Sequence, residues 1–346
     1  MSFRLTFSEP ATGTVFNKKA VALISGGLDS ALAIHLVKQQ GIDVTAIHFT
    51  SFFSIDDPEA KDSSVRVTAE QLDVPVKFIQ RGEDFIQLLR NPRYGYGKNL
   101  NPCIDCRIYT LVKAREYMKS IGASFLVTGE VVGQRPMSQR RHTLRLIEKQ
   151  ADCRGIVLRP LSAKVLPPTG PEEAGILDRD LLLGVAGRGR KMQLDLAADL
   201  NLRGFSSPAG GCLLTDRNFS RRLKDLLTSS EHVSCEELAA LRIGRHFRVR
   251  PGLKIVVGRS EEENNQLQEL AQSRNFIMPF VFPGPAVLVL GNPDEGEKEL
   301  VCRVIRRYAK PIRRGDMFTL QRPQCETEII QASGLPSEEW LSEHLI

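Results

Sequence analysis

The stretch LISGGLDSALAIHL, residues 23–36, constrains the fold of this 346-residue chain more than any other segment. A short apolar run from Ala20 to Ile24 predicts a buried strand, and the apolar spacing from Ser30 to Gln39 predicts a helix. Between them stand Gly26 and Gly27, which let the backbone adopt positive φ and approach a ligand closely. The N-terminus of the following helix offers unpaired N–H groups and a partial positive charge. The turn is therefore predicted to bind an anion.

Polar side chains around the two glycines refine this prediction. Ser25 and Ser30 add hydroxyl donors for an anion, whereas the carboxylate of Asp29 would repel a phosphate. Two explanations of Asp29 stay open: it lies beside a Mg²⁺ ion that also binds the phosphate, or it caps the helix. The segment has neither the GxxxxGK[ST] pattern of P-loop kinases nor the GxGxxG pattern of dinucleotide-binding domains, which excludes those two kinds of phosphate site.

Strand and helix patterns alternate along the first half of the chain. Further strands are expected at residues 44–49, 76–79 and 125–128, and further helices at residues 63–72 and 108–121. Because strands that alternate with helices form a parallel sheet covered on both faces, we expect an α/β fold. Such sheets bind ligands at the carboxyl ends of their strands, where both Ser25 and Gly129 fall. Gln134 follows Gly129 closely and is expected at the same corner.

The second half of the chain has a different pattern, beginning with a Pro- and Gly-rich break at residues 167–171. The expected elements are helical material at 172–202, a loop at 206–212, a basic amphipathic helix at 217–227, strands at 247–257 and 286–290, and a helix at 261–274. We therefore expect two domains. Residues 1–228 contain the parallel sheet, and residues 229–346 form a smaller α+β domain.

Seven cysteines occur in a chain whose first residues lack the apolar core of a secretory signal, so structural disulfides are not expected. Cys103 and Cys106 form a CxxC pair just before a helix, where a thiol pKa is lowered and a thiolate is a good nucleophile and metal ligand. Cys212 ends a Gly-rich loop. Together the three thiolates suit a 4Fe–4S cluster with one open iron, or a persulfide relay. A structural zinc site, which needs a fourth ligand, and inert thiols are the alternatives.

Several motifs resemble known families. SGGLDS at residues 25–30, in its strand–turn–helix frame, resembles the PP-loop ATP pyrophosphatases, which have the adenine nucleotide alpha hydrolase-like fold. LVTGEVVGQRPMSQ at residues 126–139 and VLRPL at residues 157–161 resemble the tRNA 4-thiouridine synthetase family. NPCIDC at residues 101–106 and SPAGGC at residues 207–212 resemble the tRNA 2-thiouridylase family. The CxxC pair with one further cysteine is similar to the cluster-dependent tRNA thiolases.

The resemblance implies a tRNA sulfurtransferase that adenylates a uridine carbonyl oxygen with ATP and replaces that oxygen by sulfur. It implies that Ser25, Gly26, Gly27 and Ser30 bind ATP, with Mg²⁺ near Asp29 and with Gly129 and Gln134 beside the nucleotide. Cys106 and Cys212 would carry sulfur from a cysteine desulfurase or from free sulfide, or would ligate a cluster with Cys103. Whether 4-thiouridine or 2-thiouridine forms stays open, and sulfur transfer to a small molecule or cofactor precursor is the alternative function.

The C-terminal region and the charge of the chain bear on its partners. KIVVGRSEEENNQL and FPGPAVLVLG, within residues 247–315, resemble the RNA-binding module of the NFACT proteins, and a packing or dimerisation domain is the alternative. The net charge of +6 and the paired arginines suit a polyanion such as tRNA, or a solvated surface. No apolar run of about eighteen residues occurs, so we expect a cytoplasmic protein with no membrane partner.

Overall fold

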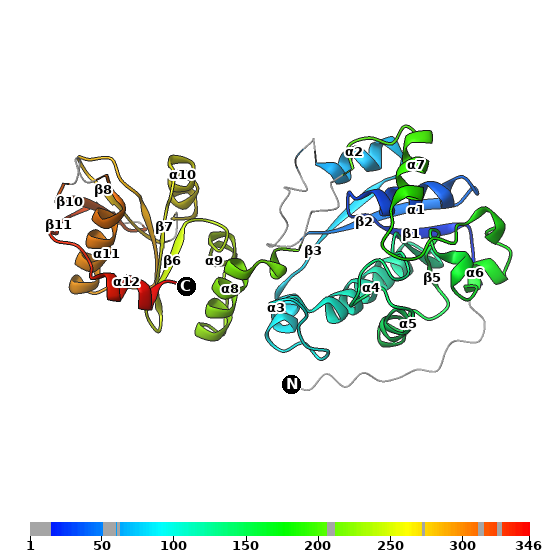
Figure 1. Ribbon diagram of the computed structural model, residues 1–346, viewed down its shortest axis with the longest axis horizontal. Coiled ribbons are helices and arrows are strands. Elements are labelled where there is room, and N and C mark those ends of the chain that lie inside the picture. The colour runs from blue at the N-terminus through cyan, green and yellow to red at the C-terminus, as the bar shows by residue number, and fades with distance from the viewer. Residues whose placement is uncertain are drawn as a thin grey trace. The chain divides into compact units, whose positions relative to one another are not determined.

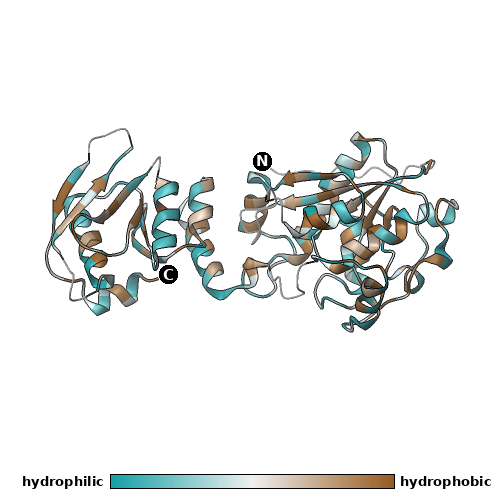
Figure 2. Cartoon of the chain, turned by 90° about the horizontal axis from the view of Figure 1, so that it is seen from above, coloured by the Kyte–Doolittle hydropathy of each residue, from teal (hydrophilic) through white to brown (hydrophobic). Residues whose placement is uncertain are grey.

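The computed structural model describes residues 15–50, 60, 63–205, 212–271, 274–310, 315–323 and 327–346. The chain divides into two compact units, Met1–Cys212 and Leu213–Ile346 (Figure 1). Most residues in the strands of both sheets are hydrophobic, whereas the helices contain both hydrophobic and hydrophilic residues (Figure 2). Among the described residues, no helix is long and apolar enough to cross a membrane.

The first unit contains a five-stranded parallel sheet with the order β3-β2-β1-β4-β5, which confirms the predicted α/β class. Its strands are β1 (Lys19–Leu23), β2 (Asp43–Thr50), β3 (Val76–Gln80), β4 (Phe125–Thr128) and β5 (Val157–Leu158). The strands β2 and β3 lie on one side of β1, and β4 and β5 lie on the other side. The carboxyl ends of β1 and β4 therefore flank the crevice where sheets of this kind bind ligands.

Helices cover both faces of this sheet (Figure 1). They are α1 (Leu28–Lys38), α2 (Ser64–Gln71), α3 (Glu83–Arg90), α4 (Cys103–Ser120), α5 (Arg141–Gln150), α6 (Gly170–Glu173) and α7 (Lys191–Asp199). Alternate residues of β1 point to opposite faces, so Ala20 and Ala22 pack with α1, α2 and α7, and Val21 packs with α4 and α5. The segment 172–202 is helical only in parts, since glycines at 184, 187 and 189 separate α6 from α7.

The second unit contains a six-stranded antiparallel sheet with the order β11-β10-β8-β9-β7-β6 and is an α+β domain. Its strands are β6 (Arg245–Arg250), β7 (Leu253–Val257), β8 (Asn275–Pro279), β9 (Val287–Leu290), β10 (Met317–Gln321) and β11 (Glu328–Gln331). Its helices are α8 (Arg217–Ser229), α9 (Cys235–Ala240), α10 (Glu261–Leu270), α11 (Glu295–Tyr308) and α12 (Glu338–His344). The single strand expected at 247–257 is a hairpin, because the backbone reverses at Gly252, whose φ is +81°.

Helix α8 belongs to the second unit, whereas the sequence placed the boundary after residue 228. Two polar contacts explain the difference. Arg222 donates to the carbonyls of Leu241 and Gly244 at 3.0 and 2.9 Å. The carboxylate of Asp225 accepts from Arg248 of β6 and Lys254 of β7, at 2.7 and 3.0 Å. These partners lie outside the helix, so its apolar periodicity could not indicate them.

Candidate nucleotide and thiol site

The turn between β1 and α1 has the geometry of an anion site. Gly27 is the N-cap residue of α1 and supplies no side-chain acceptor for the first N–H groups of the helix. Gly26 has a φ of +71°, and a Cβ on it would lie 2.2 Å from the Oγ of Ser64 in α2. Both the backbone conformation and the close approach therefore require glycine. The open helix N-terminus at the carboxyl end of a strand is a favourable place for phosphate.

The two serines of the turn have different surroundings. Ser30 is buried, and its Oγ donates to the Gly27 carbonyl at 2.8 Å and accepts from the Ser25 N–H at 3.2 Å. The Ser30 hydroxyl therefore fixes the shape of the turn. Ser25 is exposed, and its Oγ lies 3.3 Å from Ser30 Oγ. Of these two residues, only Ser25 is exposed.

Gly129 directly follows β4 and packs tightly against the start of α1. A Cβ on Gly129 would lie 2.5 Å from the carbonyl carbon and oxygen of Asp29 and 2.5 Å from the backbone nitrogen of Ser30. The backbone of the first turn of α1 therefore requires glycine at this position. Gly129 thus keeps the ends of β4 and α1 in contact and fixes the corner of the site.

The Asp29 carboxylate lies between side chains from distant parts of the first unit. Its Oδ2 accepts from Gln134 Nε2 and from Arg190 Nη2, each at 3.0 Å. Its Oδ1 is buried and has no hydrogen-bond partner among the described residues. Because Gly27 is the N-cap and Asp29 bonds elsewhere, the explanation that Asp29 caps the helix is wrong. The sequence placed Gln134 at this corner but missed Arg190, whose only signal was its place in the basic run 188–191.

A rigid turn presents Arg135 beside the same corner. Gln139 is buried, its carbonyl accepts from Gly133 N–H at 2.7 Å, and its Oε1 accepts from Arg135 N–H at 3.0 Å. The Arg135 guanidinium makes no ion pair or hydrogen bond within the described ranges. Although Arg135 reaches the surface, loss of water around it lowers its pKa, and the nearby Arg107 lowers it further. Cys103 and Asp29 oppose that shift, so Arg135 faces both the thiols and the turn.

The CxxC pair occupies the first turn of α4, which begins at Cys103, five residues earlier than predicted. Asp105, between the two cysteines, is buried and accepts from the N–H groups of Arg93 and Tyr94, each at 3.0 Å. These bonds fix the preceding loop against the helix. Burial, and then the neighbouring Cys106, raise the pKa of Cys103. The lowered pKa expected at a helix N-terminus is therefore wrong for Cys103.

An ion-pair network joins the thiol helix to the nucleotide corner. Glu130 follows Gly129, and its Oε2 accepts from Arg159 Nε at 3.0 Å while its Oε1 lies 3.5 Å from Arg107 Nε. Arg107 directly follows Cys106, and Arg159 also pairs with Glu148. Burial raises the pKa of Glu130, but Arg159 and Arg107 outweigh that effect and the pKa is lowered. Glu130 is therefore a buried carboxylate that holds α4 against the end of β4.

Cys212 ends the first unit and is exposed, while residues 206–211 of its loop lie outside the described residues. No disulfide joins any of the six described cysteines. Within the described part of the chain, no three His, Cys, Asp or Glu side chains gather as metal ligands. The described arrangement of Cys103, Cys106 and Cys212 thus does not form the three-thiolate cage that a 4Fe–4S cluster needs.

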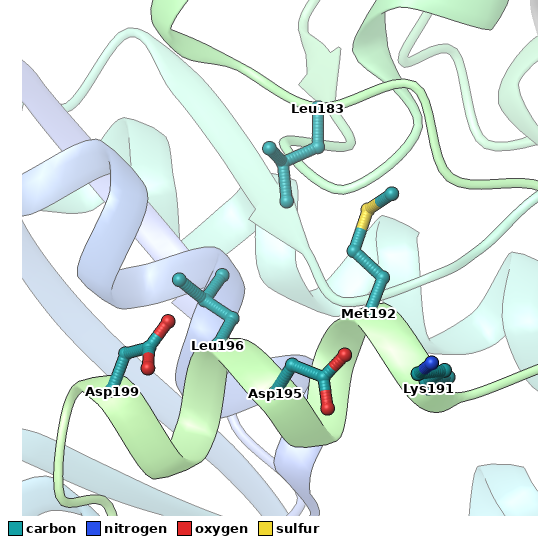
Figure 3. Close-up of a pocket in the computed structure, with 6 residues that line it drawn as sticks. All are labelled: Leu183, Lys191, Met192, Asp195, Leu196 and Asp199. Carbon is teal, nitrogen blue, oxygen red and sulfur yellow. The ribbon is translucent and has the colours of Figure 1, made fainter.

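A separate pocket lies along α7, lined by Leu183, Lys191, Met192, Asp195, Leu196 and Asp199 (Figure 3). In Figure 3 the leucines and Met192 form its apolar wall, and the two aspartates extend from the same helix. None of the residues of the turn at 25–30 lines it. Because two carboxylates repel a polyphosphate, the pocket is a poor place for ATP, and the turn is the better one.

Two family models match the chain. Residues 15–164 match the model described as "Thiamine biosynthesis protein (ThiI)", and residues 244–345 match the model described as "NFACT protein RNA binding domain". These matches confirm the resemblances drawn from the sequence motifs.

Individual relatives each match part of the chain. It is 34% identical over 117 residues to a tRNA-specific 2-thiouridylase of Desulfosudis oleivorans, which is 33% of this chain and 32% of the relative. It is 26% identical over 224 residues to the enzyme of that name in Listeria monocytogenes, which is 60% of this chain and 56% of the relative. The chain therefore spans between a third and a little over half of these two relatives.

Among solved structures, the chain is similar to a predicted tRNA methyltransferase subunit from Methanocaldococcus jannaschii, with a TM-score of 0.33, 17% identity, and coverage of 52% of this chain and 74% of the other. It is also similar to a 4-thiouridine synthetase in a complex with RNA and bound ATP, with a TM-score of 0.34, 22% identity, and coverage of 53% of this chain and 51% of the other.

Proposed function

We propose that this chain, whose residues 15–164 match the ThiI family model and whose residues 244–345 match the NFACT RNA-binding model, is an ATP-dependent tRNA sulfurtransferase. The enzyme adenylates a carbonyl oxygen of a uridine in tRNA, releasing pyrophosphate, and sulfur then displaces AMP from the activated carbon. The whole reaction is a proposal, because the relatives named 2-thiouridylase are matched over only part of their length.

The observation that carries the proposal is the convergence of cationic and hydrogen-bonding groups on one open helix N-terminus. The turn at residues 25–30 supplies backbone N–H groups and the Ser25 hydroxyl, and Arg190 reaches Asp29 from 161 residues away in the sequence. Such an arrangement is suited to a triphosphate. We assign the phosphates to Ser25, Gly26, Gly27 and Ser30, with Gln134 and Arg190 beside them and Gly129 fixing the corner.

The residues present fit a Mg²⁺ ion that accompanies ATP. The buried Oδ1 of Asp29 has no hydrogen-bond partner among the described residues and can ligate a cation. One carboxylate together with phosphate oxygens and water is a common set of Mg²⁺ ligands. When bound, the ion would neutralise charge on the phosphates. Arg190 and Gln134 hold the same carboxylate through its other oxygen, which keeps Asp29 oriented toward the turn.

We assign sulfur transfer to the thiols of Cys106 and Cys212, with Cys103 beside Cys106. A cysteine desulfurase would supply sulfane sulfur, which one thiol carries as a persulfide; its outer sulfur attacks the activated carbon and displaces AMP, and the second thiol then breaks the S–S bond and forms a disulfide. Free sulfide would instead attack the activated carbon directly as hydrosulfide. The 4Fe–4S cluster that the resemblance implies is the alternative carrier, and it would require Cys103, Cys106 and Cys212 to come together from their described positions, where they do not gather as ligands. The iron and labile-sulfide content of protein prepared without oxygen separates the two carriers.

Nucleoside mass spectrometry tests the proposal directly. Unmodified tRNA is incubated without oxygen with the protein, Mg-ATP and sulfide, and the digested nucleosides are separated. We expect a thiouridine that forms only with ATP, and its retention time distinguishes 2-thiouridine from 4-thiouridine. An ATP-binding preparation that yields no thionucleoside would redirect the assignment to a small-molecule or cofactor-precursor acceptor.

A matched pair of variants separates the site from general charge effects. Asp29→Asn removes the carboxylate at the turn, and we expect thiolation to fall to background. Asp73→Asn makes the same chemical change at an exposed residue paired with Lys38, and we expect normal activity. Equal activity in the two variants would contradict the role assigned to Asp29.

A further inference from the structure

Helix α8 has one buried face and one exposed basic face. Its buried residues are Phe219, Ser220, Leu223, Leu226 and Leu227. Arg217, Arg221 and Lys224 are exposed and follow one another at four- and three-residue spacing, so they lie along one side of the helix. We refer to these three residues as the basic stripe.

The basic stripe has a fixed orientation on the second unit. Asp225, on the inner side of α8, pairs with Arg248 and with Lys254, which is 2% exposed. Arg222 is half-buried and donates to two backbone carbonyls, so only Arg221 of that arginine pair is presented to solvent. The stripe is therefore carried by a helix that is anchored to the sheet by packing and by a partly buried ion cluster.

Among the described residues, no acidic side chain pairs with the basic stripe. Asp216 is used as the N-cap of α8, where its Oδ1 accepts from the Phe219 N–H at 2.7 Å, and Asp225 is turned inward. In the part of the chain that the structure describes, the side chains of Arg217 and Lys224 make no hydrogen bond or ion pair. Arg221 reaches only the Leu345 carbonyl, at 3.5 Å.

Helix stability does not account for this arrangement. Like charges four residues apart repel each other, as Arg217 and Arg221 do. A cation in the first helical turn also opposes the helix dipole, and Arg217 is the first residue of α8. An anionic ligand that neutralises the stripe would account for three cations that have no acidic partner among the described residues and of which two weaken the helix.

We propose that the basic stripe of α8 binds the phosphate backbone of tRNA and so extends the RNA-binding surface beyond residues 244–345. The inference rests on the proposed function for the identity of the RNA. Seven residues of helix rise about 10 Å, so the stripe spans a short run of phosphates. Contacts of this kind position the RNA and do not read its sequence.

The test compares two triple variants of the full chain with the same change in net charge. Arg217→Gln, Arg221→Gln and Lys224→Gln together remove the stripe while keeping good helix formers on α8. Lys38→Gln, Lys113→Gln and Arg115→Gln remove three cations that lie outside residues 244–345 and pair with Asp73, Asp84 and Asp152. The tRNA dissociation constant is measured for each protein over a range of KCl concentrations.

We expect the stripe variant to bind tRNA on the order of 100-fold more weakly at about 0.1 M salt, with a log–log salt slope shallower by about 2 to 3. The control variant should keep nearly the wild-type slope. ATP–pyrophosphate exchange, which reports the first unit, should be the same in all three proteins. At saturating tRNA the stripe variant should keep the wild-type thiolation rate.

Other results would overturn the inference. Equal binding by the stripe variant and the wild type would remove the stripe from the RNA surface while leaving the proposed function intact. Equal loss in both triple variants would show that net charge alone matters. Normal tRNA binding with loss of sulfur delivery from a protein donor would assign the stripe to an acidic protein. Absence of tRNA binding by the wild type would overturn both the inference and the proposed function.

Discussion

Replacing Glu130 by Gln tests whether the buried network holds the thiol helix against the nucleotide corner. The substitution keeps the shape of the side chain and removes its charge, leaving Arg159, which is 3% exposed, with Glu148 as its remaining acid. Breaking a buried ion pair costs about 3 to 5 kcal/mol, and the remaining pair favours the lower end. For a unit of this size about 3 kcal/mol corresponds to a Tm lower by about 6 to 12 °C.

Differential scanning calorimetry of the full chain measures this loss, and Glu116→Gln is the matched control. Glu116 is exposed and lies 3.7 Å from Lys113 on the same helix that carries Arg107, and Lys113, which is partly exposed, keeps Asp84 as a second partner at 3.2 Å. An exposed pair contributes about 0 to 1 kcal/mol, so the control should change Tm by only a few degrees. If Glu130→Gln lowers Tm no more than Glu116→Gln does, the network carries no net stability and the reasoning is refuted.

The pH dependence of the same variant has a definite sign. Burial raises the pKa of Glu130, but Arg159 and Arg107 outweigh it, so the folded-state pKa lies below the ordinary value of 4.5. A carboxyl of this kind adds stability above its unfolded pKa and loses it as pH falls through the folded pKa. The difference in Tm between wild type and Glu130→Gln should therefore be steady near neutral pH and shrink below about pH 4.5. A difference that grows in acid would contradict the assignment of Arg159 as the dominant partner.

Three further variants test the site. Gly129→Ala places a Cβ 2.5 Å from the Asp29 backbone and should lower both the thermal stability and ATP binding. Gly296 in α11 is the control, because the nearest atom to a Cβ there lies 3.6 Å away, so Gly296→Ala should leave Tm unchanged or raise it. Arg190→Gln removes a charged hydrogen bond and should raise the KM for ATP about 10- to 100-fold, as measured by ATP–pyrophosphate exchange. Cys212→Ala should abolish tRNA thiolation and leave ATP binding unchanged, and thiolation at the normal rate would refute its assignment to sulfur transfer.

Local patterns in the sequence were enough to predict the elements that build the corner. The strand at Ala20 to Ile24 and the helix that follows are indicated by apolar spacing, which depends only on neighbours within a few residues. Gly26 was recognisable because a positive φ at a strand–helix turn is a local requirement. The close packing of Gly129 could not be predicted in this way, since the atoms that exclude its Cβ belong to Asp29 and Ser30, about a hundred residues earlier in the chain.

Partners distant in the sequence explain what the sequence missed at the candidate site. Arg190 reaches Asp29 across 161 residues, and Glu130 joins Arg159 across 29 residues, so no periodicity could reveal either contact.

For Cys103 the helix N-terminus favours a low thiol pKa, yet burial and Cys106 outweigh it. Arg107 and Arg135 oppose that rise. The pKa of the Cys103 thiol therefore depends on the distance of these two guanidinium groups and on how much water surrounds them. Because Arg107 is held by Glu130, the same carboxylate that fixes α4 beside the turn also helps to set the charge state of Cys103. The Cys103 thiol and the end of β4 beside the turn are therefore linked through the ion pair of Arg107 and Glu130, which only the folded chain brings together.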